Sequence, residues 1–204
     1  MKAVIRRGRQ LVVDNMAVPT PGAGQVLVKT LACGICGSDL HALHHAEALA
    51  EMSRRSGGGE GMDPSKDIVF GHEFCAEILE HGIGSAKTLK AGTRVVSVPV
   101  LVGPAGAESV GYSNKIPGGF AENMLLTEAM LLEVPNGLPS SAAALTEPLA
   151  VGLHAVNLAN LENAGVAVVI GCGPVGLAVI AALKARGFGP VLAADFSPKR
   201  RASA

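Results

Sequence analysis

The sequence has no excess of charge of either sign. Its 204 residues carry 17 Lys and Arg against 17 Asp and Glu, so the formal net charge is zero. Nucleic acids and anionic membrane surfaces attract proteins with a broad basic field. The short basic clusters Arg6-Arg7 and Lys199-Arg200-Arg201 are interpreted as solvated charge near the chain ends. The charge balance therefore argues against a nucleic-acid partner and against a membrane partner.

Long apolar runs and dense cysteine are also missing. No stretch reaches the ~20 apolar residues of a membrane span. The basic start at Met1–Gln10 is not followed by the apolar run of a signal peptide. Four cysteines are too few for a small disulfide scaffold. These absences predict a cytoplasmic globular protein, whose cysteines serve as metal ligands or as plain thiols.

The first part of the chain is rich in β-type patterns. Short runs with β-branched residues are separated by glycine and proline turns, which is typical of a barrel or a sandwich. An amphipathic helix is predicted over Leu40–Arg55, and a loop over Ser56–Lys66. The predicted strands are Lys2–Arg6, Leu11–Val13, Gln25–Leu31, Ile68–Phe70, Ala76–Leu79, Thr93–Val100 and Phe120–Leu126.

The pattern changes near residue 140. Ser140–Leu161 is rich in Ala and Leu and predicts a helix that starts at Pro139-Ser140. Val166–Ile170 and Val191–Asp195 are apolar runs of the kind found in buried parallel strands. Pro174–Arg186 between them predicts a helix that Gly187 and Gly189 terminate. This part of the chain therefore predicts one βαβ unit.

A glycine-rich turn joins the first of these strands to the helix. The run Gly171-Cys-Gly-Pro-Val-Gly176 has the G-x-G-x-x-G spacing, with a strand before it and a helix after it. Asp195 follows at the end of the next strand, where a carboxylate accepts hydrogen bonds from ribose hydroxyls. That carboxylate favours NAD over NADP, although Lys199, Arg200 and Arg201 follow closely. The alternative is an ordinary glycine-rich turn without a ligand.

Three further stretches carry residues of metal-binding type. Cys33 and Cys36 are spaced like a redox pair, and His72 alone would pass for a hydrogen-bonded core histidine. Each stretch is therefore ambiguous by itself. The informative feature is their order along the chain: GICGSDLH at 34–41, GHE at 71–73, GGFAE at 118–122, EPL at 147–149 and GCGPVG at 171–176.

With this ordered set, the sequence resembles the zinc-dependent medium-chain dehydrogenases of the alcohol, sorbitol and threonine dehydrogenase group. The resemblance extends from the Met1 start to the strand that ends at Asp195. It implies a GroES-like β-barrel catalytic domain over 1–150, followed by the start of a Rossmann NAD-binding domain over 151–204. It further implies oxidation of a primary or secondary alcohol or polyol, with hydride transfer to NAD(P). The expected partner is a small alcohol, and homo-oligomers are possible.

The resemblance also assigns roles to residues. It implies that the catalytic zinc is held by Cys36, His72, Glu73 and Glu147, of which Glu73 and Glu147 compete for direct coordination. Asp39 matches the carboxylate that orients the histidine ligand. Ser38 and His41 match the groups that pass the substrate proton to solvent. The residues matched to the cofactor are Gly171, Gly173, Pro174, Val175, Gly176 and Asp195.

The remaining cysteines and histidines receive plainer interpretations. Cys33, Cys75 and Cys172 are expected to be buried or half-buried thiols. His44, His45 and His81 are expected on the surface, and His154 in helix packing.

The sequence departs from the family pattern in three places. The region Leu101–Pro117, where many relatives carry a four-cysteine lobe, has no cysteine, which predicts no structural zinc. The stretch between Cys36 and His72 is long and is expected to rim the substrate pocket, a role testable by deleting residues 57–61. The chain supplies one βαβ unit of a fold that needs two mononucleotide halves, so an incomplete enzyme is expected. Two alternatives remain: a non-catalytic zinc-binding GroES-like module or decayed enzyme remnant, and a zinc-free relative of the quinone-reductase type.

Overall fold

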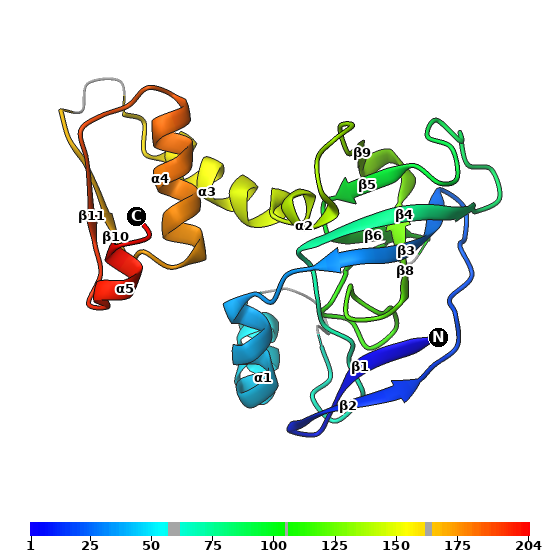
Figure 1. The fold of residues 1–204 in the computed structure, drawn as a ribbon. Helices are drawn as coiled ribbons and strands as arrows, with labels where there is room; N and C mark the ends of the chain where they lie inside the picture. Colours follow the sequence, from blue (N-terminus) through cyan, green and yellow to red (C-terminus); the bar gives the residue numbers. More distant parts are fainter. Residues whose placement is uncertain (57–61, 105, 162–164) are drawn as a thin grey trace. The chain divides into compact units, whose positions relative to one another are not determined.

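The computed structural model describes residues 1–56, 62–104, 106–161 and 165–204 (Figure 1). It forms two compact units, Met1–Leu145 and Thr146–Ala204. Among the described residues, no helix combines the length and the apolar composition needed to cross a bilayer.

The first unit is built on a five-stranded antiparallel sheet with the strand order β8-β3-β4-β5-β9. Alternate residues of its strands point into a core that includes Val26, Val28 and Ile78. β-Bulges interrupt the β3–β4 ladder between Leu27 and Val28 and between Thr30 and Ala32. The strands are β3 (Gln25–Cys33), β4 (Phe74–His81), β5 (Arg94–Ser97), β8 (Asn123–Thr127) and β9 (Leu131–Glu133), with a 3-10 turn, η1, at Glu128–Met130.

Two hairpins complete the β structure of this unit. One joins β1 (Lys2–Arg7) to β2 (Gln10–Asn15), and the other joins β6 (Val100–Gly103) to β7 (Gly106–Ser109). Thr127 ties β6 to β8, because its hydroxyl accepts from Val102 N–H at 2.8 Å and donates to the Val100 carbonyl at 2.9 Å.

Two predicted strands differ from the structure. Ile68–Phe70 is buried, but Ile68 makes only an isolated bridge with Arg6, and the Val69 and Phe70 carbonyls accept from the Gly118 and Phe120 amides. Thr93–Val100 is divided into β5 and β6. Pro99 lies at this break, and proline lacks the N–H that a continuous ladder requires.

Helix α1 (Gly37–Arg55) follows β3 (Figure 1). Ala42, Ala46 and Ala50 repeat every four residues on its buried face, and the first two pack with Met62, Ile68 and Phe70. The helix is kinked at His45, whose φ of −128° and ψ of 32° are not helical. Beyond residue 61 the chain is anchored, because Asp63 N–H donates to Asn114 and Arg6 donates to the Pro64 carbonyl. Residues 57–61, which the expected pocket rim includes, lie outside the described residues.

The predicted helix Ser140–Leu161 is two helices, α2 (Ser140–Ala143) and α3 (Thr146–Leu158). Pro148 is the third residue of α3. Proline is tolerated in the first turn of a helix but breaks its interior, so the helix begins again before it. The expected domain boundary at residue 150 lies inside α3 (Thr146–Leu158). It is five residues beyond Leu145, where the first unit ends.

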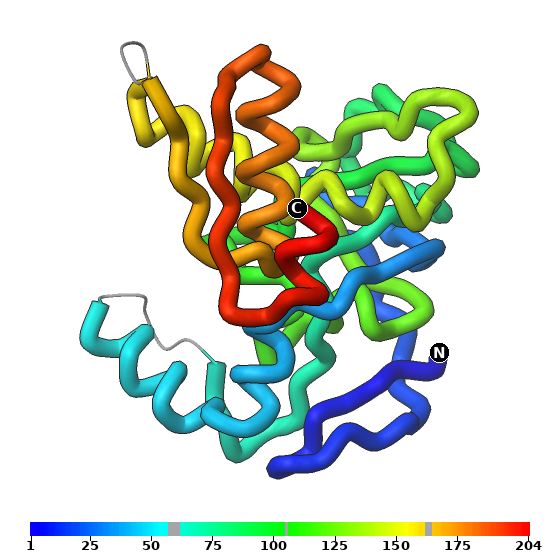
Figure 2. Tube along the Cα trace, turned by 60° about the vertical axis from the view of Figure 1, so that its left-hand side comes forward, coloured from blue at the N-terminus to red at the C-terminus, as the bar shows by residue number. Residues whose placement is uncertain are grey.

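The second unit contains the predicted βαβ element. Strands β10 (Ala167–Ile170) and β11 (Val191–Ala194) pair in parallel, and α4 (Pro174–Ala185) connects them. Figure 2 shows β11 running beside α4. Val156, Val169 and Leu183 belong to the core between α3, α4 and the strands. A last short helix, α5, spans Pro198–Arg201.

Candidate metal centre and phosphate-binding turn

The first donor of the candidate metal centre lies where β3 passes into α1. Cys36 is the N-cap of α1, and its backbone N–H donates to Asp39 Oδ2 at 3.0 Å. A carboxylate three residues into a helix commonly satisfies the N-cap amide in this way. The start of the helix therefore fixes the backbone that carries the Cys36 sulfur.

The second and third donors, His72 and Glu73, follow a glycine in a conformation that other residues rarely adopt. Gly71 has a φ of +97°, and a Cβ there would lie 2.8 Å from the Phe120 amide nitrogen. Gly34 N–H donates to the Glu73 carbonyl at 2.7 Å. A Cβ on Gly34 would lie 2.3 Å from Glu73 Oε2. The Glu73 carboxylate therefore occupies space that only a glycine at position 34 leaves open.

These three residues converge. One donor atom each from Cys36, His72 and Glu73 lie within 4.8 Å of one another. Cys36 is half-buried, whereas His72 and Glu73 are each 8% exposed. A thiol, an imidazole and a carboxylate in one cluster are the mixed donor set of a catalytic zinc site. It is the one such cluster of three or more found among the residues that the structure describes.

Asp39 links two of the donors. It is 3% exposed, and while its Oδ2 accepts from Cys36, its Oδ1 lies 3.3 Å from His72 Nδ1. Buried histidine ligands are usually oriented by such a carboxylate. His72 Nδ1 is buried without a well-aligned hydrogen bond. Burial lowers the pKa of His72, but Asp39 and Cys36 outweigh that effect and raise it to about 9. The negative charges in the cluster thus favour a bound cation.

A tyrosine that the sequence analysis did not select completes this site. The Tyr112 hydroxyl donates to Ser38 Oγ at 2.8 Å and lies 3.4 Å from Asp39 Oδ1. Its ring centroid is 5.4 Å from that of His72. Burial raises the Tyr112 pKa, and the negative charges of Asp39 and Cys36 add to the effect. Tyr112 therefore remains a protonated donor that fixes the Ser38 hydroxyl. Tyr112 is 74 residues from Ser38 in sequence, so no local motif pointed to it.

The other predicted site residues of the GICGSDLH motif and the EPL motif are placed differently. His41 is exposed on α1, where its ring contacts that of His45. Glu147 belongs to the first turn of α3 in the second unit. The geometry of the first unit therefore supports Cys36, His72 and Glu73 as ligands, and Glu147 stays a prediction.

The remaining cysteines and histidines divide into confirmed and wrong predictions. Cys75 and Cys172 are buried and Cys33 is half-buried, as expected. Burial raises the pKa of Cys33 to about 12, so it is an unreactive thiol. The prediction of a surface His81 is wrong, because its side chain is 9% exposed and its Nδ1 atom lies 3.5 Å from Glu128 Oε1. The prediction of a packed His154 is also wrong, because this residue is exposed.

The region Leu101–Pro117, in which no four-cysteine lobe was expected, is ordered by contacts to a carboxylate. Within Leu101–Pro117, the β6–β7 hairpin is followed by a turn in which Ser113 donates to Glu108 Oε2 at 2.5 Å. Lys115 Nζ lies 3.3 Å from Glu108 Oε1. Hydrogen bonds to one carboxylate thus order the segment that carries Tyr112.

The glycine-rich turn of the second unit, predicted to bind phosphate, joins β10 to α4. Gly171 has a φ of +99°, and a Cβ on Gly176 would lie 1.8 Å from the Gly171 carbonyl oxygen. No atom lies within 4 Å of a Cβ on Gly173, which is the N-cap of α4, and Pro174 follows at N1. The unbonded N–H groups of the first helical turn, near Val175, favour an anion here. The turn is therefore tight where helix and strand pack and open where a phosphate would approach.

Asp195 closes this turn. Its carboxylate accepts from the backbone N–H of Cys172 at 2.9 Å and of Ser197 at 2.8 Å. These two hydrogen bonds, and then the nearby Arg200 and Arg201, hold the pKa of Asp195 below its usual value. A pocket lies beside the turn and is lined by Cys172, Gly173, Pro174, Leu177, Ser197, Lys199, Arg200 and Ser203.

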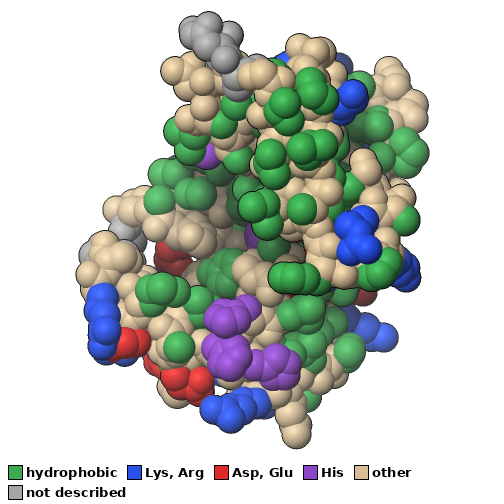
Figure 3. Space-filling view, turned by 90° about the vertical axis from the view of Figure 1, so that its left-hand side faces the viewer, with side chains coloured by type: hydrophobic (Ala, Val, Ile, Leu, Met, Phe, Trp, Pro, Cys, Tyr) green, Lys and Arg blue, Asp and Glu red, His purple; other side chains and the backbone are tan. Residues whose placement is uncertain are grey.

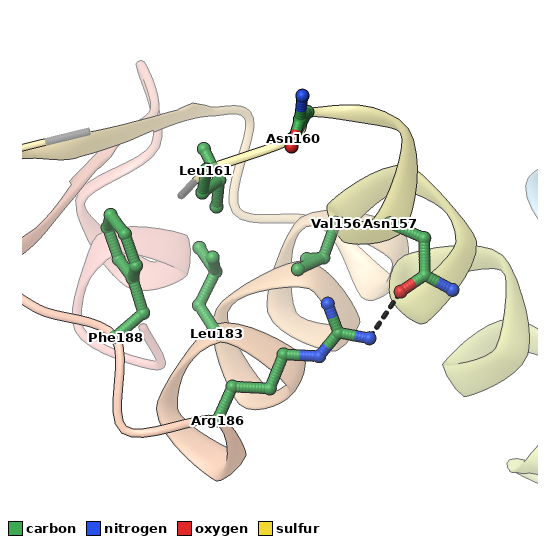
Figure 4. Close-up of a pocket in the computed structure, with 7 residues that line it drawn as sticks. All are labelled: Val156, Asn157, Asn160, Leu161, Leu183, Arg186 and Phe188. Atoms are coloured by element: carbon green, nitrogen blue, oxygen red, sulfur yellow. Dashed lines mark hydrogen bonds between the residues drawn. The ribbon is translucent and has the colours of Figure 1, made fainter. Parts of the chain in front are cut away.

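A second pocket of the same unit is lined in part by apolar side chains that pack together (Figure 4). Leu161, Leu183 and Phe188 turn their side chains toward one another there, and Arg186 reaches across to hydrogen-bond Asn157. Its described lining residues include no cluster of metal-binding or acid–base side chains, so the chemistry is not assigned to this pocket.

Comparisons with known proteins agree with this geometry. Residues 22–136 match the family model described as the alcohol dehydrogenase GroES-like domain. The chain is 36% identical over 200 residues to the (R,R)-butanediol dehydrogenase of Bacillus subtilis strain 168, covering 94% of this chain and 57% of that protein. It is 31% identical over 210 residues to a sorbitol dehydrogenase of the same organism, covering 97% of this chain and 56% of that protein. The chain thus spans somewhat more than half the length of these relatives.

Solved structures give the same result. The crystal structure of 2R,3R-butanediol dehydrogenase from Bacillus subtilis superposes with a TM-score of 0.80 at 32% identity, covering 98% of this chain and 59% of that one. A structure described as a short chain alcohol dehydrogenase from Escherichia coli CFT073, complexed with NADH, gives a TM-score of 0.79 at 26% identity, covering 98% and 58%.

Proposed function

Because the chain belongs to the family of zinc-type medium-chain alcohol dehydrogenases, we propose that it acts in the NAD-dependent oxidation of a small alcohol or polyol. One observation carries the proposal: donor atoms of Cys36, His72 and Glu73 lie within 4.8 Å of one another. A zinc ion held by these residues would supply a Lewis acid for the substrate hydroxyl, and NAD would accept the hydride.

The residues of the chain perform the rest. Cys36 and His72 would hold the ion as a thiolate and a neutral imidazole. Asp39 orients the His72 ring, and it fixes the Cys36 backbone through the same carboxylate. Glu73 supplies the carboxylate donor, at a position that Gly34 leaves free. A further ligand, Glu147, is proposed from the family pattern alone.

The proton of the alcohol needs a route to solvent. Ser38 is exposed, and its Oγ accepts from Tyr112, so its own hydroxyl hydrogen is directed elsewhere. Tyr112 therefore leaves Ser38 free to donate outward as it takes up the substrate proton. His41, exposed one helical turn further along α1, is proposed as the next proton acceptor. In this scheme the Tyr112 hydroxyl is a positioning group.

The cofactor is proposed to bind at the glycine-rich turn. The pyrophosphate would approach Gly173 and the first turn of α4, where a Cβ would meet no atom. The Asp195 carboxylate, kept ionised by two backbone N–H groups, would accept hydrogen bonds from the ribose hydroxyls and would repel a 2′-phosphate. NAD is accordingly proposed in preference to NADP.

The test measures zinc content and turnover together. Purified protein is supplied with one equivalent of Zn²⁺, NAD and butane-2,3-diol or sorbitol, and the formation of reduced nicotinamide is followed by absorbance. Zinc binding is expected of the chain itself and should be lost in His72→Ala. Alcohol-dependent reduction is expected once a second mononucleotide half is supplied, because the chain spans only 57% of the butanediol dehydrogenase that it matches. The exposed His154→Ala serves as the matched control.

The outcomes separate the alternatives. Zinc bound without turnover on any alcohol, in protein supplied with the second mononucleotide half, would identify a non-catalytic zinc-binding module. Turnover without zinc would point to a relative of the quinone-reductase type, and it would overturn the assignment of the three donors.

A further inference from the structure

Three histidines lie on the exposed face of α1; their donor atoms do not converge as those of the Cys36 cluster do, and the first of them, His41, is also the outer group of the proposed proton route. His41, His44 and His45 are exposed on this helix. Figure 3 shows histidine side chains gathered in one patch on the surface of the first unit. Surface histidines were expected here, but their clustering was not. We propose that this histidine patch, formed by His41, His44 and His45, binds one divalent transition-metal ion of the nickel, copper or zinc type.

The buried face of α1 determines which way the three histidine side chains point. Ala42, Ala46 and Ala50 are at most 5% exposed and hold α1 to the core. Residues that are three or four positions apart lie on the same face of a helix. With the alanines facing inward, His41, His44 and His45 are directed outward together. The patch is therefore presented on a rigid support.

The closest pair has the separation of a chelating pair. The ring centroids of His41 and His45 are 4.7 Å apart, with an angle of 39° between their planes. Imidazole nitrogens bind zinc at about 2.0–2.1 Å, so two rings on one ion have centroids roughly 4.5–5.2 Å apart. The kink at His45 does not separate the pair, since the distance is measured across it. The spacing of the two rings thus matches a shared ion, which would bind where rotation of the exposed side chains directs one nitrogen of each ring to the same point.

The third histidine extends the donor set. The His44 ring lies edge-on to that of His45, with a centroid separation of 6.5 Å. This separation is larger than the centroid separation of two rings that bind the same ion. The His44 side chain would therefore have to rotate to become a third ligand. Water would fill the remaining positions. The pair His41 and His45 is therefore the core of the site, and His44 strengthens it.

The surroundings on the helix favour a cation. The neighbouring turns of this face carry the uncharged Gly37, Ser38, Leu40, Ala48 and Met52, and the exposed, acidic Glu47 follows His44 by three residues. The basic residues of α1, Arg54 and Arg55, lie in its last turn and are paired with Glu51. Imidazole donors suit Zn, Cu and Ni, and poorly suit Mg or Ca. The chemistry of the patch thus selects first-row transition metals.

The test uses Ni²⁺ as the probe. Protein without an affinity tag is loaded with one equivalent of Zn²⁺ to fill the Cys36 site, and it is then titrated with Ni²⁺ by calorimetry. One Ni²⁺ per chain is expected beyond the zinc. His45→Gln should weaken this binding by about tenfold or more, because the two-ring chelate is lost. His41→Gln should act in the same way.

The controls separate this site from the zinc site. His154→Gln removes an exposed histidine from α3, and it should leave the Ni²⁺ titration unchanged. Zinc binding should be unaffected in His45→Gln. The proposal is overturned if His45→Gln binds Ni²⁺ as the original chain does, or if Ni²⁺ binding disappears with Cys36→Ser and persists without His41 and His45.

Discussion

Replacement of Gly34 by alanine tests whether Glu73 belongs to the metal centre. The added Cβ would lie 2.3 Å from Glu73 Oε2 and 3.2 Å from Glu73 Cβ. An ordinary contact needs about 3.4 Å or more, so the carboxylate must move by about 1 Å. The carboxylate is the mobile end of a flexible side chain, so the fold should accommodate this movement. The effect of the substitution should therefore appear in metal binding rather than in stability.

The magnitude follows from the precision of metal coordination. Ligand distances are held to within about 0.2 Å, so a displacement of about 1 Å removes an effective ligand. Disturbing the support of a metal ligand usually weakens binding by about 10–100-fold. That loss corresponds to about 1.4–2.8 kcal/mol of binding free energy. Zinc affinity, measured by competition with a chromophoric chelator, should fall by this factor in Gly34→Ala.

A neighbouring glycine provides the control. A Cβ on Gly37 meets no atom within 4 Å. Gly37 is also the first residue of α1, where alanine suits the helix. Gly37→Ala should therefore bind zinc as the original chain does. Equal zinc affinity in Gly34→Ala and Gly37→Ala would refute the reasoning, as would an equal loss from Gly34→Ala in a Glu73→Ala background.

Three further predictions concern the carboxylate, the histidine and the phosphate-binding turn. Asp39→Asn should lower zinc affinity by about 10–100-fold in the same competition assay, because the charge that orients His72 is lost; an unchanged affinity would contradict this. With a pKa of about 9, His72 carries a proton at neutral pH that zinc must displace. Zinc affinity should therefore rise with pH up to about 9, and calorimetry in two buffers should detect a released proton; binding independent of pH would count against the assignment. Gly176→Ala should lower the free energy of unfolding of the second unit by about 1–3 kcal/mol in urea titrations, since its Cβ would lie 1.8 Å from the Gly171 oxygen. Gly173→Ala, where the Cβ meets nothing, should be neutral, and equal stability of the two variants would show that the turn can relax.

The sequence predicted the elements whose signals are local. The βαβ unit follows from two apolar runs and a glycine turn, and the structure has β10, α4 and β11 there. The thiol, imidazole and carboxylate of the metal cluster were selected from a resemblance. Their approach to within 4.8 Å depends on the β3–α1 junction and on the Gly71 turn, which bring together residues 36 positions apart.

Other features depend on contacts that no local pattern encodes. Ile68–Phe70 is an apolar run typical of a strand, but its carbonyls accept from Gly118 and Phe120 instead of from a regular ladder. His81 ends a strand and was expected on the surface, but Glu128, distant in sequence, packs over it. Tyr112 carried no motif, and its role arises from one long-range hydrogen bond to Ser38.

The position of Tyr112 has a practical consequence. The chain has no tryptophan, a single tyrosine and five phenylalanines, which emit only weakly, so the ring of Tyr112 dominates its intrinsic ultraviolet fluorescence. That ring lies 5.4 Å from the His72 imidazole, closer than almost any attached dye could be placed. The tyrosine emission of the unlabelled protein should therefore change when the metal centre is occupied. A paramagnetic ion bound there should quench this emission.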